Sequence, residues 1–406
     1  MAMLSNYPLG EKMKILTTYN FELTTLTPLH IGNGEKYGKI DWSFQKNMLT
    51  IIDIDKLINL LENNTNSLNN LLKEIDEKRD FLMDKFIETH KIDAARIMKY
   101  SIPCQEKPNR DIYAQMKDGN YREYIPGSSI KWAIRTALMY YILRKNQSLY
   151  NNVKELIEQN LKKIEGEIKK NPHNKSKIII ERWKRKIGKP IENKIFGNDP
   201  NHDKLRSFHI SDTEPFNIDA LQVFNVNIIS IQDVNKMQDV NKMSRQATYV
   251  EGLKKDSKTK FSVIFDNFVL NQNLGEIEQL RGLGIEMIKN ACNEFAKELI
   301  DEEIKFFNNC RLNQIENLYK DLKKSLDTRN GFLLHLGWGS GWLGTTIGLL
   351  LIKKNPELIK ELRELFGLGK LNPYVNIFPK TRKIVLENKQ PKYPLGWVKI
   401  KVEESP

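Results

Sequence analysis

The chain has 406 residues, of which 40% are hydrophobic and 28% are charged, and its formal net charge is +13. This composition excludes a disordered chain and is typical of a globular protein with two or three domains. The main apolar run, residues 347–352, is too short to span a bilayer, and the first residues lack a secretory signal pattern. We therefore expect a cytoplasmic protein without membrane contact.

The positive charge is concentrated in two segments. Residues 161–194 carry an excess of eight positive charges, and residues 370–401 carry an excess of seven. Neither segment has a long apolar face opposite its cations, so nucleic acid is a better candidate partner than a membrane surface. A surplus of solvated lysines is the alternative.

Cysteines and histidines give no metal signature. Cys104, Cys292 and Cys310 lack CxxC spacing and an even count, which predicts reduced thiols. The six histidines form no HxH or HxxxH pair. We expect neither a metal nor another cofactor.

The first 145 residues alternate strand and helix signals. Residues 14–24 predict a strand, and a turn follows at 28–34. Residues 40–44 and 48–52 predict a hairpin, and 57–99 have a helical period. A capped helix is expected from about Ser129 to Arg144.

The rest of the chain is mostly helical, with short strands between the helices. Helices are expected at 146–188 with a break at 171–174, at 276–326 and at 356–366. Strand candidates are residues 208–211, 221–231, 261–268 and 331–336, followed by a basic strand region at the C-terminus. Few, dispersed strands separated by helices indicate an α+β fold.

A direct duplication interrupts this pattern. The hexapeptide QDVNKM occupies residues 232–237 and again 238–243. Two copies are too few for a repeat architecture, so we predict an exposed loop or hairpin between the strands at 221–231 and 261–268.

Residues 124–138, YIPGSSIKWAIRTAL, carry the strongest local signal. A Pro-Gly pair predicts a turn, after which Ser128 and Ser129 offer capping hydroxyls to a helix. Lys131 and Arg135 are four residues apart and therefore share one helix face. Free backbone N–H groups, the helix dipole and two cations would form an anion site, and we expect a phosphate backbone to occupy it. An ordinary capped helix with solvated cations is the alternative.

Residues 331–348, GFLLHLGWGSGWLGTTIG, form the second signal. They contain GxGxxG, but no βαβ unit surrounds it, which argues against dinucleotide binding. The glycines instead predict a close approach of another backbone, and Trp338 and Trp342 could stack on bases or fill the core.

General acid–base chemistry has three candidates. His30 lies in a glycine-rich turn, His209 lies in a predicted strand, and Asp212 follows closely. A pair drawn from them could cleave RNA, although the sequence does not define their geometry.

Five segments occur here in the order seen in CRISPR RAMP proteins, and the chain resembles in particular the fifth Csm subunit of type III-A interference complexes. They are LTPLHIGNGE at 26–35, YIPGSSIKWAIRTAL at 124–138, FHISDTEPF at 208–216, LHLGWGSGWLGTTIG at 334–348 and YPLGWVKI at 393–400. Trp132 departs from the family, which usually has glycine at that position.

The resemblance implies ferredoxin-like, RRM-related halves with helical insertions. It suggests four regions: an N-terminal RRM-like region with inserted helices (1–145), a basic helical insertion (146–207), a thumb-like hairpin region (208–270) and a C-terminal helical and RRM-like region (271–406). It further implies a set of RNA-binding residues, which are Ser128, Ser129, Lys131, Arg135, His30, Gly337, Gly339, Gly341 and, in the thumb hairpin, Arg245.

The implied function is that of a non-catalytic subunit that caps the 3′ part of the CRISPR RNA and is needed for its maturation and for complex assembly. Expected partners are CRISPR RNA, target RNA, the backbone RAMP subunit, the small helical subunit and host nucleases that trim the guide. One alternative is a metal-independent endoribonuclease that uses a loop histidine. A protein-binding scaffold is another.

Overall fold

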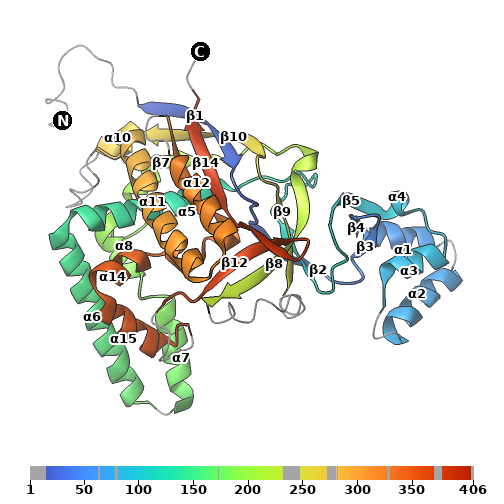
Figure 1. Ribbon diagram of the computed structural model, residues 1–406, viewed down its shortest axis with the longest axis horizontal. Helices are drawn as coiled ribbons and strands as arrows, with labels where there is room; N and C mark the ends of the chain where they lie inside the picture. The colour runs from blue at the N-terminus through green and yellow to red at the C-terminus, as the bar shows by residue number, and fades with distance from the viewer. Residues whose placement is uncertain are drawn as a thin grey trace.

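In the part of the chain that it describes, the computed structural model contains three β-sheets and a set of helices around them (Figure 1). The residues that it describes are 15–62, 65–77, 81–171, 173–231, 247–271, 280, 282–326, 330–369 and 377–403. Helices and strands alternate along the chain, and the predicted α+β class is confirmed.

The first sheet joins strands from both ends of the chain. Its order is β11 (Gly331–His335), β14 (Trp397–Val402), β1 (Leu16–Thr25), β10 (Lys258–Asp266) and β7 (Phe208–Ile210). All of its neighbours are antiparallel, and Phe21 on β1 lies opposite Phe261 on one side and Val402 on the other. Alternate residues of β1 are buried, as expected for a strand with one face on a core.

Part of this sheet has the connectivity of a ferredoxin-like fold. Strand β1 precedes the long helix α5 (Gly127–Lys145) with other elements between them, β7 and β10 come later in the chain, and the spatial order is β1-β10-β7. Helix α11 (Ile285–Asn309) packs against α5, β11 and α12 (Asn313–Lys324). In Figure 1, α11 and α12 cover the sheet on the side of the viewer.

The second sheet has six strands. Their order is β13 (Gln390–Pro394), β12 (Thr381–Glu387), β8 (Leu221–Ser230), β9 (Thr248–Leu253), β6 (Ile112–Gln115) and β2 (Gly32–Tyr37). Strands β6 and β9 are parallel, whereas the other pairs are antiparallel. Strands β8 and β9 pair on either side of the duplicated hexapeptides, which themselves lie outside the described residues. The strand predicted at 261–268 does not join this hairpin, because it lies in the first sheet as β10.

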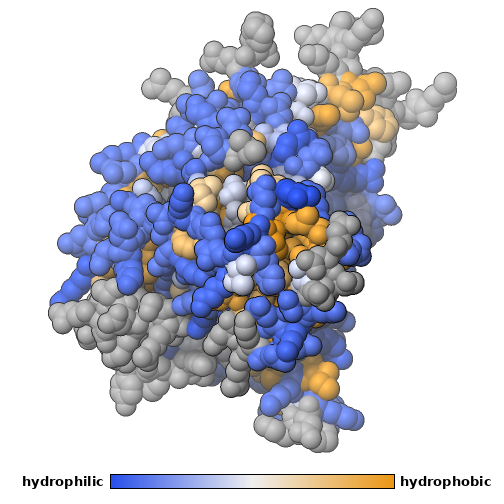
Figure 2. All heavy atoms as spheres, turned by 90° about the vertical axis from the view of Figure 1, so that its right-hand side faces the viewer, coloured by the Kyte–Doolittle hydropathy of each residue, from blue (hydrophilic) through white to orange (hydrophobic). Residues whose placement is uncertain are grey.

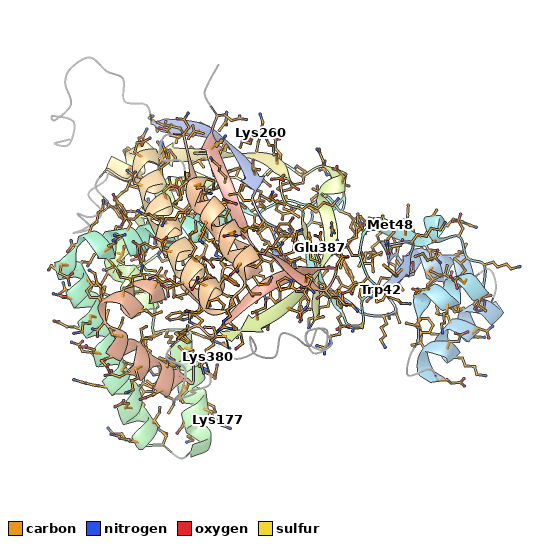
Figure 3. The ribbon with its side chains drawn as sticks, viewed as in Figure 1. Trp42, Met48, Lys177, Lys260, Lys380 and Glu387 are labelled. Carbon is orange, nitrogen blue, oxygen red and sulfur yellow. The ribbon has the colours of Figure 1, made fainter. Side chains whose placement is uncertain are left out.

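The third sheet belongs to a small lobe. It contains β3 (Trp42–Gln45), β4 (Met48–Ile52) and β5 (Met98–Pro103), with α1 (Ile54–Glu62), α2 (Thr65–Glu77), α3 (Met83–Thr89) and α4 (Ala94–Ile97) beside it. Lys46 and Asn47 have φ angles of 49° and 60°, as a two-residue hairpin turn requires. The lobe extends from one side of the molecule (Figure 1), and Figure 3 shows Trp42 and Met48 on the side that faces the main body.

A helical arm lies on the opposite side of the main body. It consists of α6 (Gln147–Lys169), α7 (His173–Lys184) and α8 (Lys189–Phe196), and α15 (Pro356–Phe366) packs against α6 and α7. Lys177 is near the far end of this arm in Figure 3. The helices expected at residues 146–188, with a break near residue 171, are therefore present, and their status as an insertion stays a prediction.

The remaining elements are short. They are η1 (Lys204–Ser207), η2 (Ile218–Ala220), α10 (Asn267–Asn271), η6 (Gly337–Gly339), α13 (Gly341–Thr345) and α14 (Gly348–Lys354). The main hydrophobic cluster runs from Phe21 to Ile400 and includes α5, α6, α11 and the first sheet, whereas the α1–α4 helices have a cluster of their own. The five-stranded sheet draws strands from three of the four regions proposed from the sequence. These regions therefore share one core.

Candidate nucleic-acid interface

Helix α5 begins where two backbones touch. A Cβ atom on Gly127 would lie 2.4 Å from the carbonyl oxygen of Ile210 and 2.5 Å from that of Ser211, so only glycine is accommodated. The residue before the first turn of the helix is Pro126, which makes no side-chain capping hydrogen bond. Ser128 and Ser129 lie inside that turn, so the predicted capping role of their hydroxyls is wrong.

The chain supplies its own acceptors at this helix start. Asp212 Oδ1 accepts a hydrogen bond from the backbone N–H of Gly127 at 2.8 Å. Lys131 Nζ donates to the carbonyl oxygen of Phe208 at 2.7 Å, and partial burial lowers the pKa of Lys131. A carboxylate and a carbonyl thus occupy the positions where the sequence placed a phosphate.

Arg135 is held in the same way. Its Nη1 lies 2.7 Å from Asp203 Oδ2, and its Nε lies 3.3 Å from Glu192 Oε2. The guanidinium carbon is 4.0 Å from the centroid of the Phe196 ring, and only 15% of the side chain is exposed. These contacts hold α5 against the helical arm and β7. Direct contact of Lys131 or Arg135 with RNA stays a prediction.

The glycine-rich loop approaches the chain's own backbone. Gly337 has a φ angle of 68°, and a Cβ atom there would lie 2.3 Å from the carbonyl oxygen of His30. At Gly339 the corresponding distance to the carbonyl oxygen of Leu395 is 2.4 Å, whereas Gly341 has open space around it. The expected close approach is present, and it joins the loop to the segment around His30 and to the strand region before β14.

An open groove separates α5 from this loop. We call it the α5–loop groove. Its volume is about 330 Å³, and it is lined by Ser128, Ser129, Trp132, Ala133, Thr136, His335, Leu336, Gly337, Ser340, Gly344 and Thr345. Two sequence motifs that are about 200 residues apart therefore form its two walls. Among the described residues, the lining contains hydroxyls, glycines, one indole, one imidazole and the aliphatic residues Ala133 and Leu336, and it contains no carboxylate.

The groove residues on α5 were not all found from the sequence. Ser128, Trp132 and Thr136 recur every fourth residue and share one helix face. Lys131 and Arg135 follow the same spacing on a neighbouring face, and the anion site was assigned to them because of their charges. The sequence thus contains two sets of residues with a spacing of four, one charged and one uncharged, and the uncharged set lines the groove.

His30 is a structural residue. It is 4% exposed, its Nδ1 is 2.6 Å from the carbonyl oxygen of Glu251, and burial lowers its pKa to about 4. Its own carbonyl oxygen accepts the N–H of Trp338 at 2.9 Å. His30 is therefore neutral at pH 7 and supports the base of the glycine-rich loop.

The other proposed acid–base residues have separate roles. His209 is exposed on β7, and Asp212 already accepts the N–H of Gly127. Among the described residues, no group of three His, Cys, Asp or Glu side chains could hold a metal ion. In the same part of the chain, no helix combines the length and apolar character that crossing a bilayer needs. Arg245 lies outside the described residues.

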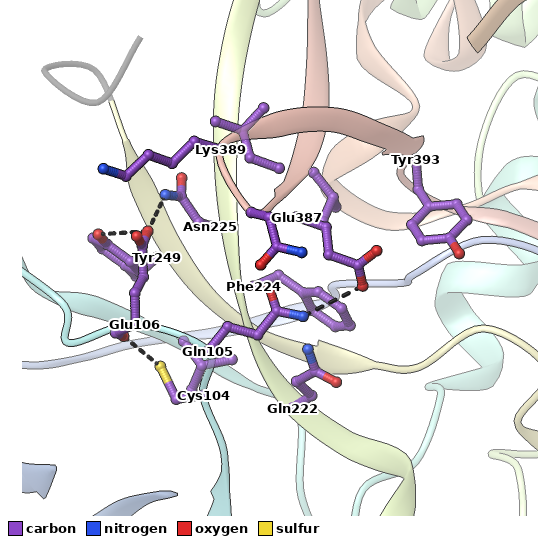
Figure 4. A pocket seen from close by; sticks show the side chains of 14 residues that line it. Cys104, Gln105, Glu106, Gln222, Phe224, Asn225, Tyr249, Glu387, Lys389 and Tyr393 are labelled. Carbon is purple, nitrogen blue, oxygen red and sulfur yellow. Dashed lines mark hydrogen bonds between the residues drawn. The ribbon is translucent and has the colours of Figure 1, made fainter. Parts of the chain in front are cut away.

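A second pocket of about 260 Å³ lies between the β8–β9 and β12–β13 hairpins (Figure 4). Its carboxylates accept hydrogen bonds from neighbouring side chains: Glu106 from Tyr249 Oη at 3.2 Å, and Glu387 from Gln105 Nε2 at 3.3 Å. Two carboxylates make this pocket a poorer site for an anionic strand than the α5–loop groove.

The face that carries the small lobe is mostly hydrophilic, with apolar side chains gathered in small patches (Figure 2). On the helical arm, exposed cations cluster on α6 and α7 and in the turn after them. They are Lys162, Lys163, Lys169, Lys170, Lys175, Lys177, Arg182, Lys184, Arg185, Lys186 and Lys189.

Comparison with known proteins adds independent findings. The family model of the RAMP superfamily matches residues 22–344. The chain is 26% identical over 414 residues to the CRISPR system Cms protein Csm5 of Methanocaldococcus jannaschii, covering 95% of this chain and 90% of that protein. It is 25% identical over 266 residues to Csm5 of Streptococcus thermophilus, covering 61% and 63% of the two chains.

Solved structures give the same result. A chain in the cryo-EM structure of a Csm–crRNA–target RNA ternary complex of a type III-A CRISPR-Cas system matches with a TM-score of 0.70 and 26% identity, over 95% of this chain and 100% of that one. The crystal structure of T. onnurineus Csm5 matches with a TM-score of 0.63 and 23% identity, over 93% and 99%. The resemblance inferred from five sequence segments is confirmed.

Proposed function

The chain belongs to the RAMP superfamily, and from this we propose that it is an RNA-binding, non-catalytic subunit of a type III-A CRISPR interference complex. In that role it covers the 3′ part of the CRISPR RNA and is needed for guide maturation and complex assembly. The observation that carries the proposal is the similarity over 95% of the chain to a component of a Csm–crRNA–target RNA complex. Cytoplasmic location is part of the proposal.

The α5–loop groove supports the RNA-binding part. Its hydroxyls and exposed backbone could contact phosphates and 2′-hydroxyls without reading sequence, as a subunit that accepts many guides requires. Ser128, Ser129 and Gly337 line the groove, and we favour them as contacts together with Gly339 and Gly341 of the same loop. Lys131 and Arg135 would act mainly by positioning α5, because their charges already have partners.

We further propose that the β8–β9 hairpin is the thumb that contacts the guide–target duplex, with Arg245 in its connection. Its antiparallel register from Leu221–Leu253 to Val226–Thr248 supports a rigid hairpin base. Other Csm subunits, especially the backbone RAMP subunit and the small helical subunit, are the proposed protein partners. Host nucleases that trim the guide could dock on the assembled complex.

Endoribonuclease activity is the competing function. A general base needs a pKa near the working pH and access to its substrate. His30 has a pKa of about 4 and is 4% exposed, which argues against this role. Incubation of the pure protein with labelled precursor RNA in EDTA decides the question, since cleavage that His30→Ala or His209→Ala abolishes would replace our proposal.

The central test is assembly with and without this chain. Csm complexes are reconstituted or purified in both forms, and the guide 3′ ends are mapped. We expect longer, heterogeneous 3′ ends and incomplete complexes when the chain is absent. Identical guide ends and intact complexes would contradict the proposal.

A salt titration tests the mode of binding. Each phosphate contact to a single strand contributes about 0.7 to the slope of log K against log salt. Replacing exposed Lys162 and Lys169 on α6 and Lys170 directly after it with Gln should lower the slope by up to about 2. The matched control replaces three exposed lysines of the small lobe with Gln, namely Lys73, Lys85 and Lys91. Equal changes in both variants would indicate a bulk charge effect without an RNA-binding arm.

A further inference from the structure

Trp132 is a large apolar side chain that is exposed to solvent in the α5–loop groove. Its residue is 55% exposed, although it belongs to a helix whose following residues are almost all buried. The large apolar residues with comparable exposure, such as Ile15, Ile178 and Phe268, do not line the groove. The indole is therefore the one large, exposed apolar side chain in the described lining, in which hydroxyls and glycines predominate.

Contacts made by the neighbouring face of α5 hold this ring in place. Lys131 donates to the carbonyl of Phe208, and Arg135 pairs with Asp203 and Glu192, which together prevent rotation of the helix about its axis. Thr136 Oγ1 donates to the carbonyl oxygen of Trp132 at 3.1 Å. Lys131 and Arg135, which the sequence analysis assigned to phosphate binding, thus orient Trp132 toward the groove.

The far wall leaves room for a flat ring. Gly337 and Gly344 carry no side chain, and Ser340 Oγ is turned to the carbonyl of Gly337 at 2.5 Å. His335 lines the floor, and burial lowers its pKa to about 4, so it adds no charge at pH 7. A volume of about 330 Å³ that is free of carboxylates suits an uncharged aromatic ring joined to an anionic backbone.

We propose that Trp132 stacks on one unpaired base of a single-stranded RNA in this groove, with Ser128 and Ser129 facing the adjoining backbone. This rests on the proposed RNA-binding function and adds a base contact to it. Base–aromatic stacking tolerates any base, because every base has a π face, so it agrees with guides of many sequences. A protein partner is less suited to the groove, since one isolated indole offers no apolar patch.

The test measures binding of the full-length protein to a labelled single-stranded oligoadenylate by fluorescence anisotropy. Trp132→Ala should raise Kd about 5- to 100-fold, and Trp132→Phe should retain most of the affinity. The slope of log K against log salt should stay unchanged in both, because no phosphate contact is lost. Phe268→Ala is the matched control, since that ring is 58% exposed and lies outside the groove.

A second measurement guards against a folding defect. Wild type and Trp132→Phe are compared for tryptophan fluorescence with and without saturating oligonucleotide, and the difference should show quenching assigned to Trp132. Wild-type affinity in Trp132→Ala, an equal loss in Phe268→Ala, or absence of that quenching would overturn the stacking proposal and leave the proposed function standing. Absence of RNA binding by the wild-type protein would overturn both.

Discussion

Arg135 forms ion pairs with Asp203 and Glu192, and this leads to a prediction that distinguishes structural cations from RNA-binding cations. Arg135→Gln removes the charge that lies between Asp203 and Glu192 and above the Phe196 ring. A partly buried cation–π contact contributes about 1–2 kcal/mol. The carboxylates of Asp203 and Glu192 are 24% and 30% exposed. Breaking their ion pairs with Arg135 should therefore cost about 1–2 kcal/mol, which is less than the roughly 3–5 kcal/mol for a fully buried pair.

The expected loss in the free energy of unfolding is therefore about 2–4 kcal/mol. Thermal unfolding followed by circular dichroism should show a lower midpoint, whereas the affinity for single-stranded RNA below that midpoint should be nearly unchanged. Asp203→Asn in the same chain should recover part of the loss, because it removes one of the carboxylates left without a cation.

Arg185→Gln is the matched control, since Arg185 is exposed in the basic arm. It should show the reverse pattern, with wild-type stability and weaker RNA binding. The reasoning would be refuted if Arg135→Gln unfolded at the wild-type temperature and lost RNA affinity at least tenfold.

Two further predictions concern the glycine-rich loop and the buried histidines. Gly337→Ala and Gly341→Ala both place Ala at a positive φ, which costs about 1 kcal/mol. Only the Ala at position 337 would also clash with the carbonyl oxygen of His30, so the unfolding midpoint of Gly337→Ala should be clearly lower than that of Gly341→Ala. Equal midpoints in the two variants would contradict the close approach. His30 and His335 have a pKa lowered to about 4 by burial, whereas unfolded imidazoles titrate near 6.5, so the unfolded state binds protons first as pH falls. Stability should therefore decrease between about pH 6.5 and pH 4, and His335→Gln should reduce that decrease in unfolding scans at pH 7.5 and 5.

Local patterns predicted most of the longer elements. The strands β1, β8 and β11 and the helices α5, α6, α11 and α15 lie close to their expected positions, because apolar periodicity and Gly or Pro breaks define them. Strand β2 was expected to be a turn, since residues 32–37 read GNGEKY and are largely exposed. Strands β5, β6 and β9 were missed, and they depend on pairing partners that are distant in sequence.

The sequence predicted the two segments that form the candidate site, but it did not predict which residues contact one another there. Residues 124–138 and 331–348 do meet at one groove, as the resemblance implied. The partners of Arg135 come from residues 57 and 68 positions away, and the acceptor for Gly127 is 85 positions away. No local rule reveals such partners, so the phosphate site assigned to the start of α5 could be assessed only in three dimensions.

The first sheet has a consequence for synthesis of the protein. Strand β14 lies between β1 and β11, and the N–H of Trp397 donates to Thr27 across 370 positions of sequence. While the ribosome makes the middle of the chain, the edge of β1 that β14 will cover is still unpaired, whereas the helices of the small lobe can already pack on one another. Closure of this sheet must await the synthesis of β14, so this edge of β1 is open to wrong pairing until residues 397–402 have been made.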